Sequence, residues 1–221
     1  MFMQVNDLDL QKESTFLQAI SLIFRLIRMD KVANTSKAKK MANISFNPFP
    51  VLKSERLTLR QLSLTDQQDV FALRADEEIN RFLDRKPAET IEDAIRFINV
   101  INANIKNNIS VYWAITLTET REFVGTICLF DFSNDKTSVE IGYELLKRFQ
   151  GQGIMSEAIE KVINYVFKVL KFQKILAVTH YQNYASAKLL TQFNFLPSKE
   201  IDNQHIDFST FTLTNVYLTS L

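Results

Sequence analysis

Apolar and polar residues alternate along much of the chain with the period of a β-strand. The first clear case is Leu57 and Leu59, which alternate with the polar residues Thr58 and Arg60. This alternation predicts a strand with one buried face. Three longer strand-like runs occupy residues 111–118, 123–131 and 138–145. Because only short polar turns separate these three runs, we expect them to form an antiparallel meander.

Other segments repeat their apolar residues at the spacing of an α-helix. A long helix is expected to begin at Thr90, because Ile91 and Ile95 then lie on one face. An earlier helix is expected to open at Thr65, with Gln68 as its partner in a capping box. Further helical patterns cover residues 77–83, 154–170 and 185–192.

The order of strands and helices predicts a single mixed sheet. The helix over 154–170 connects the strand over 138–145 to a strand over 175–179, and a crossover helix of this kind joins parallel strands. Two terminal strands are expected near 196–201 and 208–213. We therefore expect an α+β or mixed α/β fold, built as one domain from a mostly antiparallel sheet with helices on its faces.

The first 45 residues differ from the rest. Apolar side chains from Phe16 to Ile27 recur at helical spacing, and a polar, basic stretch covers 31–40, which predicts one amphipathic helix and a linker. Three interpretations stay open: a helix that docks on its own domain or on a second copy in a homodimer, a membrane-surface helix, or a start assigned too early, with Met41 as the true beginning. The main domain is taken as residues 46–221.

The composition limits the partners of the chain. Lys and Arg (26) balance Asp and Glu (25), so the net charge of +1 provides no overall attraction to nucleic acid. The single cysteine, Cys128, cannot form an internal disulfide, which fits a cytoplasmic protein. The chain has only two histidines in addition to this cysteine, so these residues cannot form a typical zinc site, and we expect no metal. No apolar run reaches the roughly 20 residues of a membrane span.

Two of the four glycines stand close together where a strand and a loop lead into the helix over 154–170. Gly151 and Gly153 permit positive φ and close approach to the backbone, while the first helical turn leaves N–H groups unpaired at the positive end of the helix dipole. This combination predicts an anion site, with Arg148 adding positive charge. A plain tight turn is the alternative. A Rossmann fingerprint would need a third glycine at Ser156, and no P-loop Gly-Lys-Ser/Thr is present.

The residues around this turn carry a family resemblance. Arg148, Gly151 and Gly153 fill the pattern Gln/Arg-x-x-Gly-x-Gly/Ala, and the run that contains them resembles the acyl-CoA-binding motif of GNAT acetyltransferases. The flanking runs Glu-Ile-Gly-Tyr and Met-Ser-Glu-Ala resemble the RimJ/RimL-type branch of ribosomal-protein N-acetyltransferases. Similar segments stand in the same order at residues 54–60, 112–115, 124–127 and 183–186. The resemblance covers the chain from about Val51 onward.

The resemblance implies that acetyl-CoA is the acyl donor. Its pantetheine would lie where the sheet splays, between the strand that ends near Leu145 and the strand over 175–179, and its pyrophosphate would lie on the glycine turn. Asn183 would lie beside the pantetheine arm, and Ser186 near the thioester sulfur. The residues so implied in cofactor binding are Leu145, Arg148, Gln150, Gly151, Gln152, Gly153, Ile154, Met155, Asn183 and Ser186.

The reaction that this family performs moves an acetyl group to a primary amine, here either a protein N-terminal amine or a small amine. It needs an unprotonated amine and a proton for the departing thiolate. Glu140 is the candidate base, with an outward-facing residue or a structural ion pair as the alternatives. Many GNAT enzymes place a tyrosine acid four residues after the serine, but Leu190 stands there. That leaves Ser186 or water as the acid, with Tyr181 and Tyr184 as weaker options.

Several residues keep a second interpretation. Asn183 is equally suited to be the N-cap of the helix that follows it, and Cys128 is expected to pack in the core. Because Leu190 replaces the usual acid, the alternative function is a GNAT-fold module that binds acyl-CoA or a peptide without efficient turnover. The candidates for attracting a cationic acceptor, otherwise part of a solvated helix face, are Asp76, Glu77, Glu78 and Asp84.

Overall fold

The structure is a computed structural model that describes residues 44–83, 85–198 and 208–215. The amphipathic helix and basic linker predicted for the N-terminal extension lie outside the described residues, and the domain boundary near residue 45 stays a prediction.

Eight strands form one sheet in the order β1-β2-β3-β4-β5-β6-β8-β7. Every neighbouring pair is antiparallel except β5 and β6, which are parallel. This arrangement confirms the predicted meander and the single parallel pairing across a crossover helix. The strands are β1 (Leu52–Lys53), β2 (Leu57–Gln61), β3 (Val111–Leu117), β4 (Phe123–Phe130), β5 (Ser138–Leu145), β6 (Lys174–His180), β7 (Leu196–Ser198) and β8 (Phe208–Thr214).

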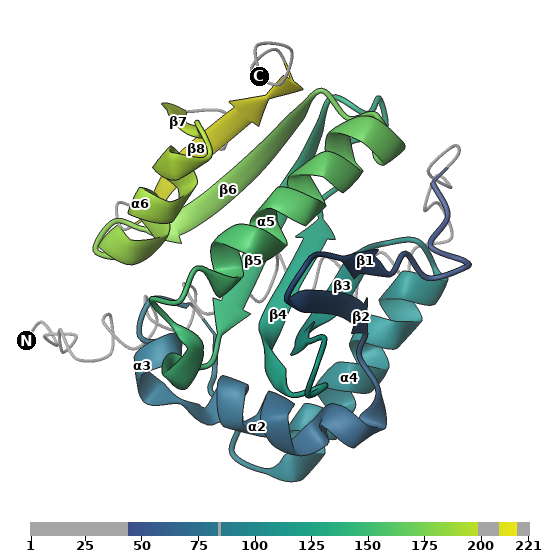
Figure 1. Cartoon of the computed structure of the whole chain (residues 1–221), viewed down its shortest axis with the longest axis vertical. Helices are drawn as coiled ribbons and strands as arrows, with labels where there is room; N and C mark the ends of the chain where they lie inside the picture. The colour runs from purple at the N-terminus through teal and green to yellow at the C-terminus, as the bar shows by residue number, and fades with distance from the viewer. Residues whose placement is uncertain (1–43, 84, 199–207, 216–221) are drawn as a thin grey trace, which may run out of the picture.

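Helices cover both faces of the sheet, with α5 crossing one face in Figure 1. Successive side chains of a strand point to opposite faces, and Trp113 of β3 meets Tyr165 after α5, while the preceding Tyr112 meets Phe97 of α4. The helix α5 and the pair α2 and α4 therefore lie on opposite faces. The helical segments are η1 (Leu64–Asp66), α2 (Gln67–Ala75), α3 (Glu77–Asn80), α4 (Ile91–Lys106), η2 (Lys147–Phe149), α5 (Ile154–Asn164), the π-helical η3 (Tyr165–Leu170) and α6 (Tyr184–Gln192).

The first helix begins earlier than the sequence predicted. Its N-cap is Ser63, whose backbone N–H donates to the carboxylate of Asp66 at 2.8 Å, and a short 3₁₀ turn precedes α2. The expected capping box of Thr65 and Gln68 is therefore wrong. Asp66 is the better partner because its carboxylate also accepts from Arg60 of β2, which lies in another element.

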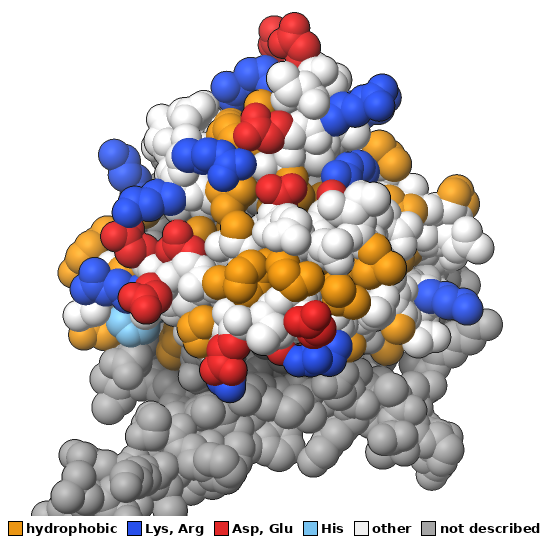
Figure 2. All heavy atoms as spheres, turned by 90° about the horizontal axis from the view of Figure 1, so that it is seen from below, with side chains coloured by type: hydrophobic (Ala, Val, Ile, Leu, Met, Phe, Trp, Pro, Cys, Tyr) orange, Lys and Arg blue, Asp and Glu red, His pale blue; other side chains and the backbone are white. Residues whose placement is uncertain are grey.

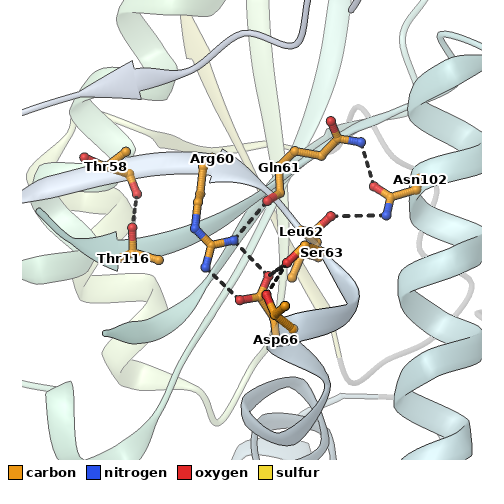
Figure 3. A network of polar contacts seen from close by, with 9 residues as sticks. Thr58, Arg60, Gln61, Leu62, Ser63, Asp66, Asn102 and Thr116 are labelled. Carbon is orange, nitrogen blue, oxygen red and sulfur yellow. Dashed lines mark hydrogen bonds and ion pairs between the residues drawn. The ribbon is translucent and has the colours of Figure 1, made fainter. Parts of the chain in front are cut away.

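A polar network fixes this end of β2 to the helices around it (Figure 3). Arg60 donates to both carboxylate oxygens of Asp66, at 2.8 and 2.7 Å, and the Asp66 side chain is only 6% exposed. Asn102 of α4 donates to the Leu62 carbonyl at 3.1 Å and accepts from Gln61 at 2.8 Å. The loop after β2 is thereby held between α2 and α4, which form one wall of the site described below.

The same pair perturbs the titration of its carboxyl group. Burial by itself raises the pKa of Asp66, but the hydrogen bonds from Arg60 and Ser63 outweigh burial, so the pKa of Asp66 lies below its usual range. The hydrogen bond to Asp66 likewise raises the pKa of the Arg60 guanidinium. The ionised carboxylate therefore stabilises the fold.

We expect Asp66→Asn to lower the free energy of unfolding by about 2 kcal/mol near pH 7, because the amide replaces a charged group that accepts hydrogen bonds from Arg60 and Ser63. Because the pKa of Asp66 is depressed in the folded protein, its stabilisation is complete above the pKa of an unfolded aspartate, about 3.9. It is lost as the pH falls through the folded-state pKa. Urea unfolding of both proteins at a series of pH values measures the difference.

The control is Asp69→Asn, on the same helix. Asp69 forms no ion pair with the described residues, and burial raises its pKa, so its replacement should change stability by less than about 0.5 kcal/mol. The assignment fails if Asp66→Asn and Asp69→Asn are equally stable, or if their difference does not shrink below about pH 4, where aspartate protonates.

The parallel pair β5 and β6 separates after a short stretch of pairing. Only 138–141 of β5 pairs with 174–177 of β6, although β5 continues to Leu145 and β6 to His180. The separation of the two strands can be followed in Figure 1. The predicted splay of the sheet is confirmed.

Candidate active site

A loop with two left-handed glycines leads from β5 into α5. Gly151 and Gly153 both have φ of 73°, a conformation that costs a residue with a side chain about 1–2 kcal/mol. Gly153 is the N-cap of α5 and supplies no side-chain cap to the N–H groups of the first turn. Those N–H groups can therefore bind an anion at the positive end of the helix dipole. We call residues 150–155 the cradle.

The cradle offers its backbone rather than its side chains. Gln150 donates through Nε2 to the Leu145 carbonyl at 3.0 Å, and Gln152 donates to the Arg148 carbonyl at 2.8 Å, so both amides stabilise the loop itself. The side chains of Ile154 and Met155 are buried in the core. In Gln152, Ile154 and Met155 the backbone N–H is therefore the group that can meet a phosphate, whereas the N–H of Gln150 donates to the Lys147 carbonyl at 3.1 Å.

Two arginines lie at the cradle. Arg148 lies over the Phe149 ring and donates to Glu122 at 3.2 Å, in a pair that is exposed on both sides. Exposed pairs of this kind contribute about 0–1 kcal/mol, so Arg148 can turn to a phosphate at little cost. Arg56, which the sequence did not single out, donates to the Gln152 carbonyl at 3.2 Å and pairs with Glu157 of α5 at 2.7 Å.

Beyond the cradle, a cavity of about 250 Å³ opens on the face of the sheet that α2 and α4 cover. Its walls come from α2, α4, the segment after α3, the middle strands and the start of α6. Residues from both separating strands reach it, Gly142 and Tyr143 from β5 and Val178 and Thr179 from β6. The cavity therefore meets the splay of the sheet.

The predicted catalytic residues Glu140 and Ser186 both line this cavity. Glu140 of β5 is 7% exposed and stands beside Leu176 of β6 in the last part of the parallel pairing. Asn183, also in the lining, accepts from the Ser186 backbone N–H at 3.1 Å. This confirms Asn183 as the N-cap of α6 and fixes the position of Ser186.

A tyrosine that the sequence did not single out contacts Ser186. The hydroxyl groups of Tyr143 on β5 and Ser186 on α6 lie 2.9 Å apart. Burial raises the pKa of Tyr143 to about 12, so its hydroxyl stays protonated at neutral pH. Tyr181 and Tyr184, the tyrosines considered earlier, are 48% and 74% exposed and do not line the cavity. The pair is formed across the splay, which no local pattern reveals.

A nearly buried ion pair forms another wall of the cavity. Arg85 donates to both oxygens of Glu144, at 2.6 and 2.7 Å, and to Asn80 at 2.7 Å. The two side chains are only 10% and 13% exposed. Burial opposes the charge on Arg85, but the attraction and hydrogen bonds of Glu144 outweigh it and raise the pKa of Arg85. Glu144 is thus held in an ion pair with Arg85.

The thiol of Cys128 also lines the cavity, and burial raises its pKa. A thiol that stays protonated is a weak nucleophile, which agrees with the predicted packing role. The acidic residues predicted to attract a cation lie elsewhere: Asp76 caps α3 by accepting from the Ile79 N–H, and Glu78 pairs with Lys147 on the surface. Neither these nor Glu77 line the cavity, and Asp84 lies outside the described residues.

Acidic and basic side chains are interspersed on the face shown in Figure 2, as the balanced composition predicted. In the described part of the chain, no helix is both long enough and apolar enough to cross a membrane. Within those residues, too, no group of three or more His, Cys, Asp or Glu side chains is placed to hold a metal ion.

A family profile described as acetyltransferase (GNAT) domain matches residues 56–195. The matched segment holds the cradle, the splay and every residue that lines the cavity except Phe208. The chain therefore belongs to the GNAT acetyltransferase family, and it is an acetyl-CoA-dependent acyltransferase.

Similar proteins agree with this assignment. The chain is 32% identical over 169 residues to the "Uncharacterized N-acetyltransferase YoaA" of Bacillus subtilis (strain 168), covering 76% of this chain and 96% of that protein. It is 31% identical over 170 residues to the "Uncharacterized N-acetyltransferase p20" of Bacillus licheniformis, covering 77% and 94%.

Solved structures share the fold. An acetyltransferase of the GNAT family from Bacillus anthracis matches with a TM-score of 0.63 at 20% identity, covering 75% of this chain and 98% of that one. The spermidine N-acetyltransferase from Vibrio cholerae, in complex with CoA and spermine, matches with a TM-score of 0.64 at 20% identity, covering 75% and 99%. The predicted fold class is confirmed.

We expect Glu144→Leu to destabilise the fold by about 3 kcal/mol, because it leaves the guanidinium of Arg85 largely buried without its counter-ion. Adding Arg85→Met should recover at least half of that loss, since an apolar pair can replace a buried ion pair. Urea unfolding measures both variants. The exposed Arg96→Met is the control and should change stability by less than about 0.5 kcal/mol. Additive losses in the double variant would contradict this account.

Proposed function

We propose that the protein transfers the acetyl group of acetyl-CoA to a primary amine, either a small amine or a protein N-terminal amine, by direct attack in a ternary complex. The observation that supports this most strongly is that the cavity meets the splay between β5 and β6 and is lined by Glu140 and Ser186. The donor and the acceptor could thus approach from opposite faces of the sheet.

The cradle and the splay fit acetyl-CoA. Pyrophosphate oxygens suit the unpaired N–H groups at the start of α5, with Arg56 and Arg148 close by. The pantetheine arm suits the edges that β5 and β6 expose beyond their pairing, near Leu145. When bound there, acetyl-CoA supplies an activated acetyl group at the inner end of the splay.

The two catalytic roles fall to residues on either side of the cavity. Glu140 takes a proton from the acceptor amine, directly or through a water, as the C–N bond forms and the C–S bond breaks. Ser186 donates its hydroxyl proton to the departing sulfur, and the Tyr143 hydroxyl, 2.9 Å away, orients the serine hydroxyl and can replace its proton. In this proposal, the Tyr143 hydroxyl on β5 assists Ser186, because Leu190 stands at the position where many GNAT enzymes have a tyrosine acid.

The finer assignments belong to the same proposal. The runs on either side of the cradle support the RimJ/RimL-type branch, and the single cysteine supports action in the cytoplasm. The alternative is a protein that binds acyl-CoA without efficient turnover, because the buried Leu190 cannot act as an acid.

Acetyl-CoA binding tests the cradle. A Cβ atom at Gly151 would meet no other atom within 4 Å. We therefore expect Gly151→Asn, in a conformation that asparagine tolerates, to fold and to retain binding. Gly151→Asp has nearly the same shape but should bind about ten-fold more weakly than the asparagine variant, because its charge repels the pyrophosphate. Calorimetry measures both affinities, and thermal unfolding checks the fold. Equal affinities would remove the pyrophosphate from this loop.

Turnover tests the base. Thiol release from acetyl-CoA, with the best amine of a panel of peptides and small amines, should fall roughly 10²–10⁴-fold in Glu140→Gln, with acetyl-CoA affinity retained. Raising the pH should restore part of the rate, because more of the amine is then unprotonated. A variant as fast as the wild type would exclude Glu140 as the base. Tight acetyl-CoA binding by a wild type that turns over no amine would favour the alternative function.

A further inference from the structure

One cation in the cavity lacks an acidic partner among the described residues. Arg74 of α2 lines the cavity, and its guanidinium carbon lies 3.8 Å from the centroid of the Phe97 ring. No carboxylate of a described residue lies within ion-pair distance of it. The ring contact, which is a cation–π interaction, is weaker than a salt bridge in a desolvated site.

The surroundings of Arg74 lower the pKa of its guanidinium on balance, so they do not stabilise its charge fully. Burial lowers the pKa of Arg74, and the nearby charge of Arg85 lowers it further, while the attraction of Glu144 opposes both effects. Glu144 forms its ion pair with Arg85, which donates to both of its oxygens, and no hydrogen bond joins the described side chains of Glu144 and Arg74. Arg74 is partly buried and has no carboxylate of a described residue within ion-pair distance, so an anionic ligand beside it would be stabilised.

The second carboxylate of the cavity lies farther along the strand. Glu140 stands four residues before Glu144 on the same face of β5. The cavity thus presents, at the α2 wall, a guanidinium that forms no ion pair with the described residues and, at β5, a carboxylate. Its aromatic walls include Phe97, Tyr112 and Phe130. This distribution matches a small molecule that carries an anionic group and an amine on an apolar body.

We propose that the acceptor is an amine with its own carboxylate, of the amino-acid class, and that Arg74 binds that carboxylate. This inference rests on the proposed acetyl transfer. The planar fork of a guanidinium binds a carboxylate through two parallel hydrogen bonds, which fixes its orientation. The same cation repels a polyamine, whose charges are all positive. A cavity of about 250 Å³ suits a single amino acid rather than a long chain.

Matched substrate pairs test the proposal. We would compare leucine with leucinamide and phenylalanine with phenylalaninamide, by thiol release from acetyl-CoA, with spermidine as the cationic reference. The acid of each pair should have a kcat/KM about 10–100-fold higher than its amide, which corresponds to a charged hydrogen-bonding contact. The amine of an amide is less basic and more of it is unprotonated, so amine reactivity alone would favour the amide.

Variants of Arg74 test whether this residue causes the preference for the acid over the amide. In Arg74→Gln the acid-to-amide ratio of kcat/KM should fall to near one, and in Arg74→Lys it should be intermediate, because the charge remains but the fork is lost. The control is Arg96→Gln, an exposed arginine of α4 with a side chain that is 69% exposed, which should keep the wild-type ratio. Because each ratio is taken within one protein, a loss of folded enzyme does not change it.

A binding measurement separates this proposal from the transfer reaction itself. Leucine and leucinamide are titrated by calorimetry into the protein saturated with CoA. Tighter binding of leucine that Arg74→Gln abolishes supports the proposal even where no acetyl transfer is seen. Equal binding and equal turnover of acid and amide, or a preference for spermidine, would overturn it while leaving acetyl transfer to an amine intact.

Discussion

The early end of the hydrogen bonding between β5 and β6 is the constraint on which the site depends. After four residue pairs the two strands separate, and both continue for three or more residues without each other. Backbone groups inside a sheet are almost always paired, so a gap of this kind offers donors and acceptors to an extended ligand. The cradle at the end of β5, the cavity behind the gap and the contact of Tyr143 with Ser186 are all arranged around it.

The regular parts of this fold were predictable because local sequence determines them. The three strands of the meander end within one residue of their predicted limits, since polar turns bound each apolar run. The helix over 154–170 was predicted as continuous, but it becomes π-helical at Tyr165, a change in hydrogen bonding that hardly alters the apolar pattern. The start of the first helix was missed because Arg60, which selects Asp66, belongs to a strand.

The candidate site also has parts that the local sequence determines and parts that it does not. The cradle is a local feature, and two glycines before a helix were enough to predict it. Arg56 lies almost a hundred residues from the cradle it contacts, and Tyr143 meets Ser186 from a different element. The roles of Arg74 and Arg85 could not be predicted, because charged residues on a helix such as α2, or in a polar connecting segment such as the one that holds Arg85, are usually only solvated. The acidic residues nearby drew attention instead, although the structure directs those described away from the cavity.

The two substrates are expected to meet different kinds of protein surface, and this difference bears on how the family diversifies. The cradle and the splay present mainly backbone groups, which most substitutions leave in place, so a motif for the donor can persist while other residues change. The acceptor cavity is walled by side chains from α2, α4 and the segment after α3, and single substitutions there alter its charge and shape. A match to the family therefore defines the donor, whereas the acceptor has to be inferred from cavity-lining residues such as Arg74.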